Sequence, residues 1–152
     1  MLTAYRIVKA RHARSTFSGE GARLAGGRWN RPGEAVIYTS ASLALAAIET
    51  FVHLGDDSLH MRFVYFEIEI LEAVGIQRCV RPPAHWRAEP PQEESMRYGP
   101  AWLRVNRTAV LEVPSAIVPS EKNYLLNPKH ADFRWIRVAR AQPFFFDPRM
   151  WK

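Results

Sequence analysis

Residues 62–71 read Arg-Phe-Val-Tyr-Phe-Glu-Ile-Glu-Ile-Leu, and their side chains alternate between two kinds. One set is apolar and consists of Val64, Phe66, Ile68 and Ile70. The positions between them hold Tyr65, Glu67 and Glu69. Because successive side chains of a strand point to opposite faces, this pattern predicts a strand with one buried face. Such one-sided burial is typical of an antiparallel or mixed sheet.

The clearest helix precedes that strand, at residues 43–54. Ser40 or Ser42 can cap its first turn, and Gly55 can end it in the left-handed conformation. The polar side chains fall on one arc of the helical wheel together with Ser42 and Ala46, and they are Glu49, Thr50 and His53. The rest of the circumference is apolar, so we expect a mostly buried helix.

The remaining elements predicted by the sequence are short. Strands are expected at 36–39, at 109–113 with a continuation at 116–118, at 136–139 and at 144–146, and a short helix closes at 102–105. Turn-forming and polar residues predict loops around a short element at 6–34, and loops at 81–93 and 120–134. Few helices and short, irregularly joined strands indicate an α+β fold, in a single domain over residues 1–152.

Composition excludes several classes of protein. With 152 residues and 47% hydrophobic content, the chain can bury a core and is not disordered as a whole. The single cysteine, Cys79, excludes a disulfide framework and is expected to be a packed, unreactive thiol. No histidine spacing matches a metal motif, so no metal is expected. The lack of a long apolar run or a signal-peptide pattern favours a cytoplasmic protein and no membrane partner.

The net charge of +6 comes from a surplus of basic residues, most of which are arginines. Arginine suits bidentate binding of phosphate and carboxylate groups. The surplus therefore fits a nucleic acid, a phosphorylated small molecule or an acidic protein surface. Because the arginines are scattered along the chain and form no basic tail or helix, direct binding of a nucleic acid is the weaker expectation.

The segment Gly26-Gly27-Arg28-Trp29-Asn30 has two interpretations. As a ligand loop, it lets the backbone approach a ligand closely, with Arg28 offered to a phosphate or ribose and Trp29 to a base. As a structural turn, it exposes Arg28 and buries Trp29 in the core. It is neither a phosphate-binding P-loop nor a Gly-x-Gly-x-x-Gly dinucleotide fingerprint, because the required spacings are missing.

Three further residues also have a chemical and a structural interpretation. Tyr38, just after the loop, can stack on a planar ring or belong to the core. Glu49 either lines a cleft, where a carboxylate stabilises an oxocarbenium-like transition state, or shares a solvated helix face. Ser115 ends a strand without a Gly-x-Ser-x-Gly elbow, so it suits a hydrogen-bonding role or a simple turn.

Taken together, these segments resemble the RES domain, a family named for a typical Arg, Glu and Ser. The matching stretches are, in order, Phe17-Ser18-Gly19-Glu20-Gly21-Ala22-Arg23-Leu24, Gly26–Asn30, Tyr38-Thr39-Ser40, Leu43–Glu49, Val113-Pro114-Ser115-Ala116, Asn123–Pro128 and Phe146-Asp147-Pro148-Arg149. Each stretch is weak alone, but their order and spacing cover about residues 5–150, and this makes the match specific.

The resemblance implies a toxin of a bacterial toxin–antitoxin pair, with an Xre-type helix-turn-helix antitoxin as partner. Apart from the resemblance, a second copy of the chain is a further candidate partner. It implies an ADP-ribosyltransferase-like fold, a split mixed sheet around an NAD cleft. Characterised members deplete NAD+ by hydrolysis or phosphorolysis of the nicotinamide–ribose bond, and others attach ADP-ribose to a protein. NAD+ is therefore the expected substrate. The alternatives are a protein mono-ADP-ribosyltransferase, a nucleic-acid-binding or RNase toxin, and a non-enzymatic scaffold within an antitoxin complex.

The resemblance also assigns roles to individual residues. Arg28 is expected to bind a phosphate or ribose oxygen, Tyr38 to pack against nicotinamide, and Glu49 to orient the ribose and support the cationic transition state. Ser115 is expected to position the nicotinamide ribose or the attacking group, although Ser120 lies close by in sequence. The second-tier candidates for contacting NAD+ are Arg23 and Asn123.

Overall fold

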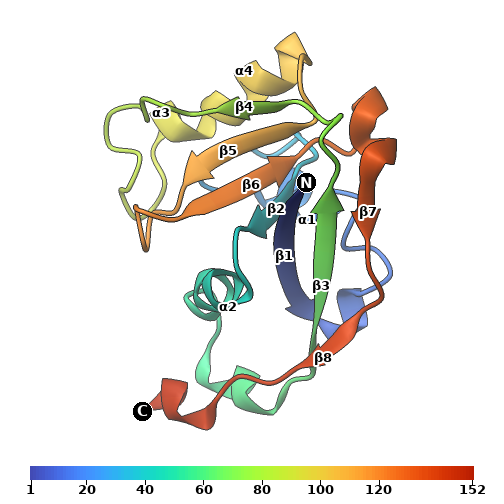
Figure 1. Ribbon diagram of the computed structural model, residues 1–152. Coiled ribbons are helices and arrows are strands. Elements are labelled where there is room, and N and C mark those ends of the chain that lie inside the picture. The colour runs from blue at the N-terminus through green and yellow to red at the C-terminus, as the bar shows by residue number, and fades with distance from the viewer.

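A computed structural model describes residues 1–152. Its eight strands form one sheet in the order β4-β5-β6-β2-β1-β3-β7, and β8 also pairs with β3 (Figure 1). The strands are β1 (Leu2–Lys9), β2 (Ile37–Ser40), β3 (Phe63–Ile70), β4 (Ile76–Arg78), β5 (Val110–Pro114), β6 (Lys122–Leu126), β7 (Ile136–Val138) and β8 (Gln142–Phe144). The helices are α1 (Glu20–Ala25), α2 (Leu43–Phe51), α3 (Glu93–Met96) and α4 (Tyr98–Val105). The 3₁₀ turns are η1 (Ala10–His12), η2 (Asp56–His60), η3 (Ala131–Trp135) and η4 (Pro148–Trp151). Only β4 and β5 pair in parallel, so the predicted α+β class with a mixed sheet is confirmed.

Strand β3 is the strand predicted from the alternation at 62–71. Phe66, Ile68 and Ile70 are buried, and Glu67 between them is exposed. Full burial of such an apolar side chain contributes roughly 1.5–3 kcal/mol, so the inner face of β3 is a main anchor of the core. Along its whole length β3 pairs with β1, which makes this the longest ladder of the sheet.

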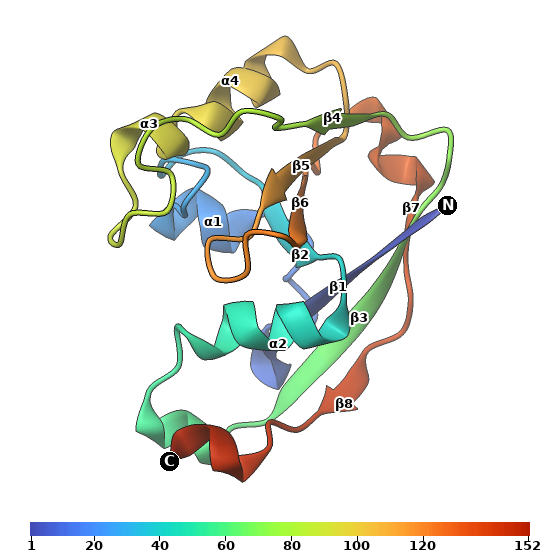
Figure 2. The same ribbon diagram turned by 60° about the vertical axis from the view of Figure 1, so that its left-hand side comes forward.

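The sheet opens between β1 and β2. Tyr5 opposite Ser40 is the one residue pair that joins these strands. On one side lie β4, β5, β6 and β2, on the other β1, β3, β7 and β8, and the two groups diverge (Figures 1 and 2). Arg6 spans the opening, because its Nη1 donates to the carbonyl of Tyr38 at 2.7 Å and its Nε to the Thr16 hydroxyl at 2.7 Å.

Three apolar clusters hold the two halves and their helices together. The largest lies across the opening and includes Ala4, Ile37, Ile68, Val110 and Leu126. The second packs α4 and the 26–30 loop against the β5–β6 side and contains Trp29, Val36, Cys79, Trp102, Leu111, Val113 and Leu125. The third, around Ile7, Ala46, Phe63 and Phe146, attaches α2 and the C-terminal segment to β1 and β3. There Phe51, Phe63, Phe144, Phe146 and Trp151 pack with ring centroids 4.9–6.2 Å apart.

Two strands contradict the sequence prediction of loops. Residues 6–34 begin within β1, where the polar Arg6 breaks the apolar pattern but finds partners in the sheet opening. Residues 120–134 contain β6, a polar-looking segment that becomes a central strand because β2 and β5 flank it on both edges. The predicted strand continuation at 116–118 is wrong, since the chain turns there.

Helix α2 also differs from its prediction. Ser42 caps it, with its hydroxyl accepting from the Leu45 amide at 3.0 Å, but the helix ends at Phe51 and Gly55 has an ordinary φ of −96°. The predicted mostly buried helix is wrong as well, because Ile48 is 36% exposed while Ala46 on the expected polar arc is buried. Only the side of α2 that meets β1 and β2 is covered. None of the helices has the length and apolar character needed to cross a membrane.

Candidate active site

A cleft of about 960 Å³ lies at the opening between the two halves of the sheet. One side, the loop wall, consists of residues 26–29, Tyr38 and residues 87–91. The other side, the helix wall, is the inner face of α2. Four residues named from the sequence line this one cleft: Arg28, Tyr38, Glu49 and Asn123. Their positions in the chain are far apart, so the fold brings them together.

The 26–30 loop is a tight turn fixed by side chains from within. Gly26 has a φ of +72°, and Gly27 and Asn30 exchange backbone hydrogen bonds of 3.0 and 3.3 Å. The Tyr38 hydroxyl donates to Asn30 Oδ1 at 2.5 Å and accepts from the Trp29 amide at 3.2 Å. A Cβ atom on Gly27 would lie 2.6 Å from that hydroxyl oxygen, so only glycine allows this close approach.

Trp29 belongs to the core. Its side chain is 2% exposed and stacks on Trp86 with ring centroids 6.0 Å apart. Tyr98 meets the same ring edge-on at 5.7 Å. The structural interpretation is therefore right for Trp29, while the neighbouring Arg28 lines the cleft.

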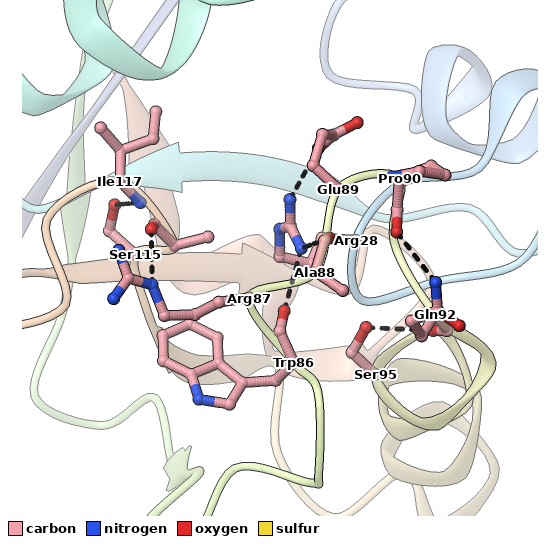
Figure 3. A network of polar contacts seen from close by, with 11 residues as sticks. Arg28, Trp86, Arg87, Ala88, Glu89, Pro90, Gln92, Ser95, Ser115 and Ile117 are labelled. Carbon is pink, nitrogen blue, oxygen red and sulfur yellow. Dashed lines mark hydrogen bonds and ion pairs between the residues drawn. The ribbon is translucent and has the colours of Figure 1, made fainter.

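Arg28 is held by the segment that faces it. Its Nη1 donates to the carbonyl oxygens of Trp86 at 2.9 Å and Ala88 at 2.7 Å (Figure 3). Its Nη2 donates to Glu89 Oε2 at 3.0 Å. The Arg28 side chain is 18% exposed, so it is a largely desolvated cation at the edge of the cleft.

Tyr38 offers its ring rather than its hydroxyl. Burial raises the pKa of Tyr38 above its ordinary value, so the phenol is neutral at physiological pH. Both hydrogen bonds of the hydroxyl are made within the loop wall, to Asn30 and from Trp29. An aromatic face in a cleft is suited to packing against another planar ring.

Glu49 is aimed by a short chain of hydrogen bonds. The side-chain amide of Asn123 donates to Glu49 Oε2, and Ser40 Oγ donates to Asn123 Oδ1 at 2.7 Å. Three elements, α2, β6 and β2, thus converge on one carboxylate. The other oxygen, Oε1, accepts no hydrogen bond from the protein, which leaves it for a ligand.

Arg6 is a cleft residue that the sequence did not reveal. Its only hydrogen-bond acceptors, the Thr16 hydroxyl and the Tyr38 carbonyl, are neutral. Burial lowers the pKa of Arg6 to about 10, so it remains protonated at neutral pH without a carboxylate partner. A desolvated cation without a counter-ion favours an anionic ligand. The sequence does not reveal this residue, because the polar Arg6 interrupts the apolar pattern of β1 and the pattern predicts a loop there.

Comparison with known proteins identifies the family of this chain. Residues 3–147 match the RES domain. The chain belongs to the RES domain family. It is 42% identical over 149 residues to a protein named Toxin Res from Yersinia enterocolitica, covering 96% of this chain and 97% of that one. It is also 42% identical over 138 residues to a Prs ADP-ribosylating toxin from a Sphingobium species, covering 88% and 86%.

A solved structure shares the fold of this RES chain. It is a chain of the MbcT–MbcA toxin–antitoxin complex of M. tuberculosis, with a TM-score of 0.78 over 99% of this chain and 86% of that chain. At 18% identity this likeness concerns the fold. The predicted membership of the RES family is confirmed, and so is the predicted similarity to proteins named as toxins.

Two residues carried over from the RES resemblance lie outside the cleft lining. Ser115 is fully buried, and its hydroxyl accepts from the amides of Ile117 at 3.1 Å and Val118 at 3.1 Å. It fixes the turn whose Ile117 lines the cleft (Figure 3). Arg23 pairs on the surface with Glu20 at 2.7 Å.

The charges that line the RES cleft are mainly positive. Four are cations, Arg6, Lys9, Arg28 and Arg87, and two are carboxylates, Glu49 and Glu89. This balance suits a ligand with a phosphate group.

The one cysteine, Cys79, is buried in the core cluster of Trp29, and burial raises the pKa of its thiol, as expected of an unreactive cysteine. No group of three His, Cys, Asp or Glu side chains is placed to hold a metal ion.

Proposed function

We propose that this RES chain is an enzymatic toxin that binds NAD+ in the cleft and breaks its nicotinamide–ribose bond. The convergence of Arg28, Tyr38 and Glu49 on one cleft supports this most directly. The three residues match the RES pattern in sequence, and they meet where two diverging strands leave room for a dinucleotide. The volume of about 960 Å³ lies in the range of pockets that hold such ligands.

In this proposal the two arginines bind the pyrophosphate, and the carboxylate of Glu49 stabilises the transition state of bond breaking. Arg28 and Arg6 neutralise the pyrophosphate, and the ring of Tyr38 packs on the nicotinamide. The bond breaks when nicotinamide leaves with the bonding electron pair, so positive charge develops on the ribose. Glu49, fixed by Asn123, stabilises that charge from a preorganised position.

The group that accepts the ADP-ribose after nicotinamide leaves determines which type of enzyme this is. Water gives ADP-ribose, phosphate gives ADP-ribose-1″-phosphate, and a protein side chain gives an ADP-ribosylated target. Transfer to a protein side chain is the second candidate, because one relative is named as a Prs ADP-ribosylating toxin. We propose NAD+ depletion as the main activity and transfer to protein as the alternative.

We also propose that the partner of this chain in the bacterial cytoplasm is an antitoxin of the Xre helix-turn-helix type. The likeness to a toxin from a toxin–antitoxin complex supports a partner of this general kind. The basic surface of the chain favours an acidic segment on that partner.

The test is nicotinamide release from NAD+ by the purified chain, freed of any antitoxin. Arg28→Ala is expected to raise KM by about tenfold or more, because a charged hydrogen-bonding group contributes roughly 1.5–3 kcal/mol. Arg107→Ala, which removes an exposed arginine outside the cleft, is the matched control. Added phosphate and a labelled protein target separate the three acceptors. No release by the wild type would refute the proposal.

A further inference from the structure

The anion position at Arg28 is already filled by the protein itself. Glu89 places Oε2 at 3.0 Å from Arg28 Nη2, and the same glutamate lines the cleft. Within the loop wall, this contact joins Arg28 to a segment 61 positions away in sequence (Figure 3). A carboxylate thus lies where the proposed function needs a phosphate.

The donors of Arg28 divide into two groups. Nη1 donates to two backbone carbonyls, those of Trp86 and Ala88, and these bonds hold the 86–89 segment in place. Nη2 donates only to Glu89, and Nε donates to no protein group. A guanidinium has five N–H donors, so the Nε–Nη2 edge offers a bidentate site as soon as Glu89 withdraws.

Glu89 can withdraw without disturbing the segment that carries it. Its side chain is 76% exposed and has Arg28 as its one ion-pair and hydrogen-bond partner. The backbone around it stays anchored, by Arg28 through Ala88 and by Arg87, whose Nε donates to the Ala116 carbonyl at 3.0 Å. A rotation of one exposed side chain therefore opens the site, and water replaces Arg28 as the partner of Glu89.

We infer that Glu89 is a competing internal anion that the ligand's phosphate must displace from Arg28. This inference rests on the proposed function, since it assigns the displacing group to the pyrophosphate of NAD+. The consequence is a lower affinity for the substrate than the same cleft would have without Glu89. Because the displacement precedes chemistry, the penalty falls on KM rather than on kcat.

The test compares three variants for two quantities, the Kd of ADP-ribose by calorimetry and the KM for NAD+ by nicotinamide release. Glu89→Gln removes the charge and keeps the shape. Glu89→Asp keeps the charge and shortens the reach to Arg28. Glu94→Gln removes an exposed carboxylate outside the cleft and controls for overall charge.

We expect Glu89→Gln to lower both Kd and KM by about two- to fivefold, since an ion pair with one exposed partner contributes up to roughly 1 kcal/mol. Glu89→Asp is expected to shift in the same direction, and Glu94→Gln to match the wild type. Equal gains in Glu89→Gln and Glu94→Gln would mean a general charge effect and would overturn the inference. Weaker binding by Glu89→Gln would also overturn it, because Glu89 would then order Arg28 instead of competing for it.

The two proposals fail in different ways. A wild-type chain that neither binds ADP-ribose nor releases nicotinamide contradicts the proposed function. A wild-type chain that does both, while Glu89→Gln binds no more tightly, contradicts only the role of Glu89.

Discussion

The two walls of the cleft are built on different principles. In the loop wall, the 26–30 turn, Tyr38 and Arg28 are tied by hydrogen bonds to Asn30, Trp86 and Ala88, and the same residues pack the core around Trp29. In the helix wall, Glu49 makes one side-chain hydrogen bond, with Asn123, on a helix whose outer face is exposed. Folding and binding share residues in the first wall and are largely separate in the second. Substitutions in the two walls should therefore have different signatures.

The largest expected effect is on the helix wall, at Glu49. Glu49→Gln keeps the size of the side chain but removes the charge that supports the cationic transition state. We expect kcat for nicotinamide release to fall by about 10²–10³, the usual loss for one preorganised electrostatic group. The free energy of unfolding should change by less than about 1 kcal/mol, because the amide oxygen of the new side chain can still accept from Asn123. A marked loss of stability would show that residues of the helix wall also serve both folding and binding.

The next effect is on the loop wall, at Gly27. In Gly27→Ala the new Cβ meets the Tyr38 hydroxyl at 2.6 Å and Asn30 Oδ1 at 3.0 Å. We expect the free energy of unfolding to fall by about 1–3 kcal/mol, as for an overpacked site, and NAD+ binding to weaken with it. Gly21→Ala in α1 is the control for stability, because a Cβ there meets no atom within 4 Å. That control should stabilise the chain by up to about 1 kcal/mol.

A third effect concerns Arg6, which touches both halves of the sheet. Arg6→Lys keeps the charge but cannot donate to Tyr38 and Thr16 with one planar group. We expect KM for NAD+ to rise by about tenfold, with a smaller loss in stability. Arg14→Lys, an exposed arginine outside the cleft, should leave both unchanged. An unaltered KM in Arg6→Lys would contradict the proposed role of Arg6 in binding NAD+.

The smallest effect is expected at Ser115. Ser115→Ala leaves the amides of Ile117 and Val118 without their acceptor, which should reduce stability by about 1 kcal/mol and raise KM a few-fold. Ser120→Ala, an exposed neighbour, is expected to behave as the wild type. A fall in kcat above tenfold with unchanged stability would instead support direct contact of Ser115 with the substrate.

The sequence predicts this fold well where a segment carries its own pattern. The alternation at 62–71 identifies β3, and Ser42 marks the start of α2. It fails where neighbours determine the structure. β6 has few strand-forming residues at its start and is a strand because β2 and β5 lie on both sides of it. The buried face of α2 likewise depends on which strands it meets, and a helical wheel cannot supply that.

The cleft is predicted only in part, for a related reason. Arg28, Tyr38, Glu49 and Asn123 could be named because they fit the RES pattern. Arg6 and Glu89 could not, since each acts through a partner distant in sequence. Their roles depend on a gap between two strands and on the crossing of a loop, which are properties of the assembled chain.

The place of β6 in the sheet has a consequence for incomplete products of synthesis. It is the last strand in chain order to line the cleft, it covers the free edge of β2, and it supplies the partner of Glu49. A ribosome that stops before residue 122 releases a polypeptide with Arg28, Tyr38 and Glu49 but without the strand that pairs with β2 and holds the Glu49 carboxylate. Premature stop codons and frameshifts upstream of β6 should therefore yield harmless fragments. For a toxin, this means that only nearly full-length chains, which contain β6, can harm the host cell.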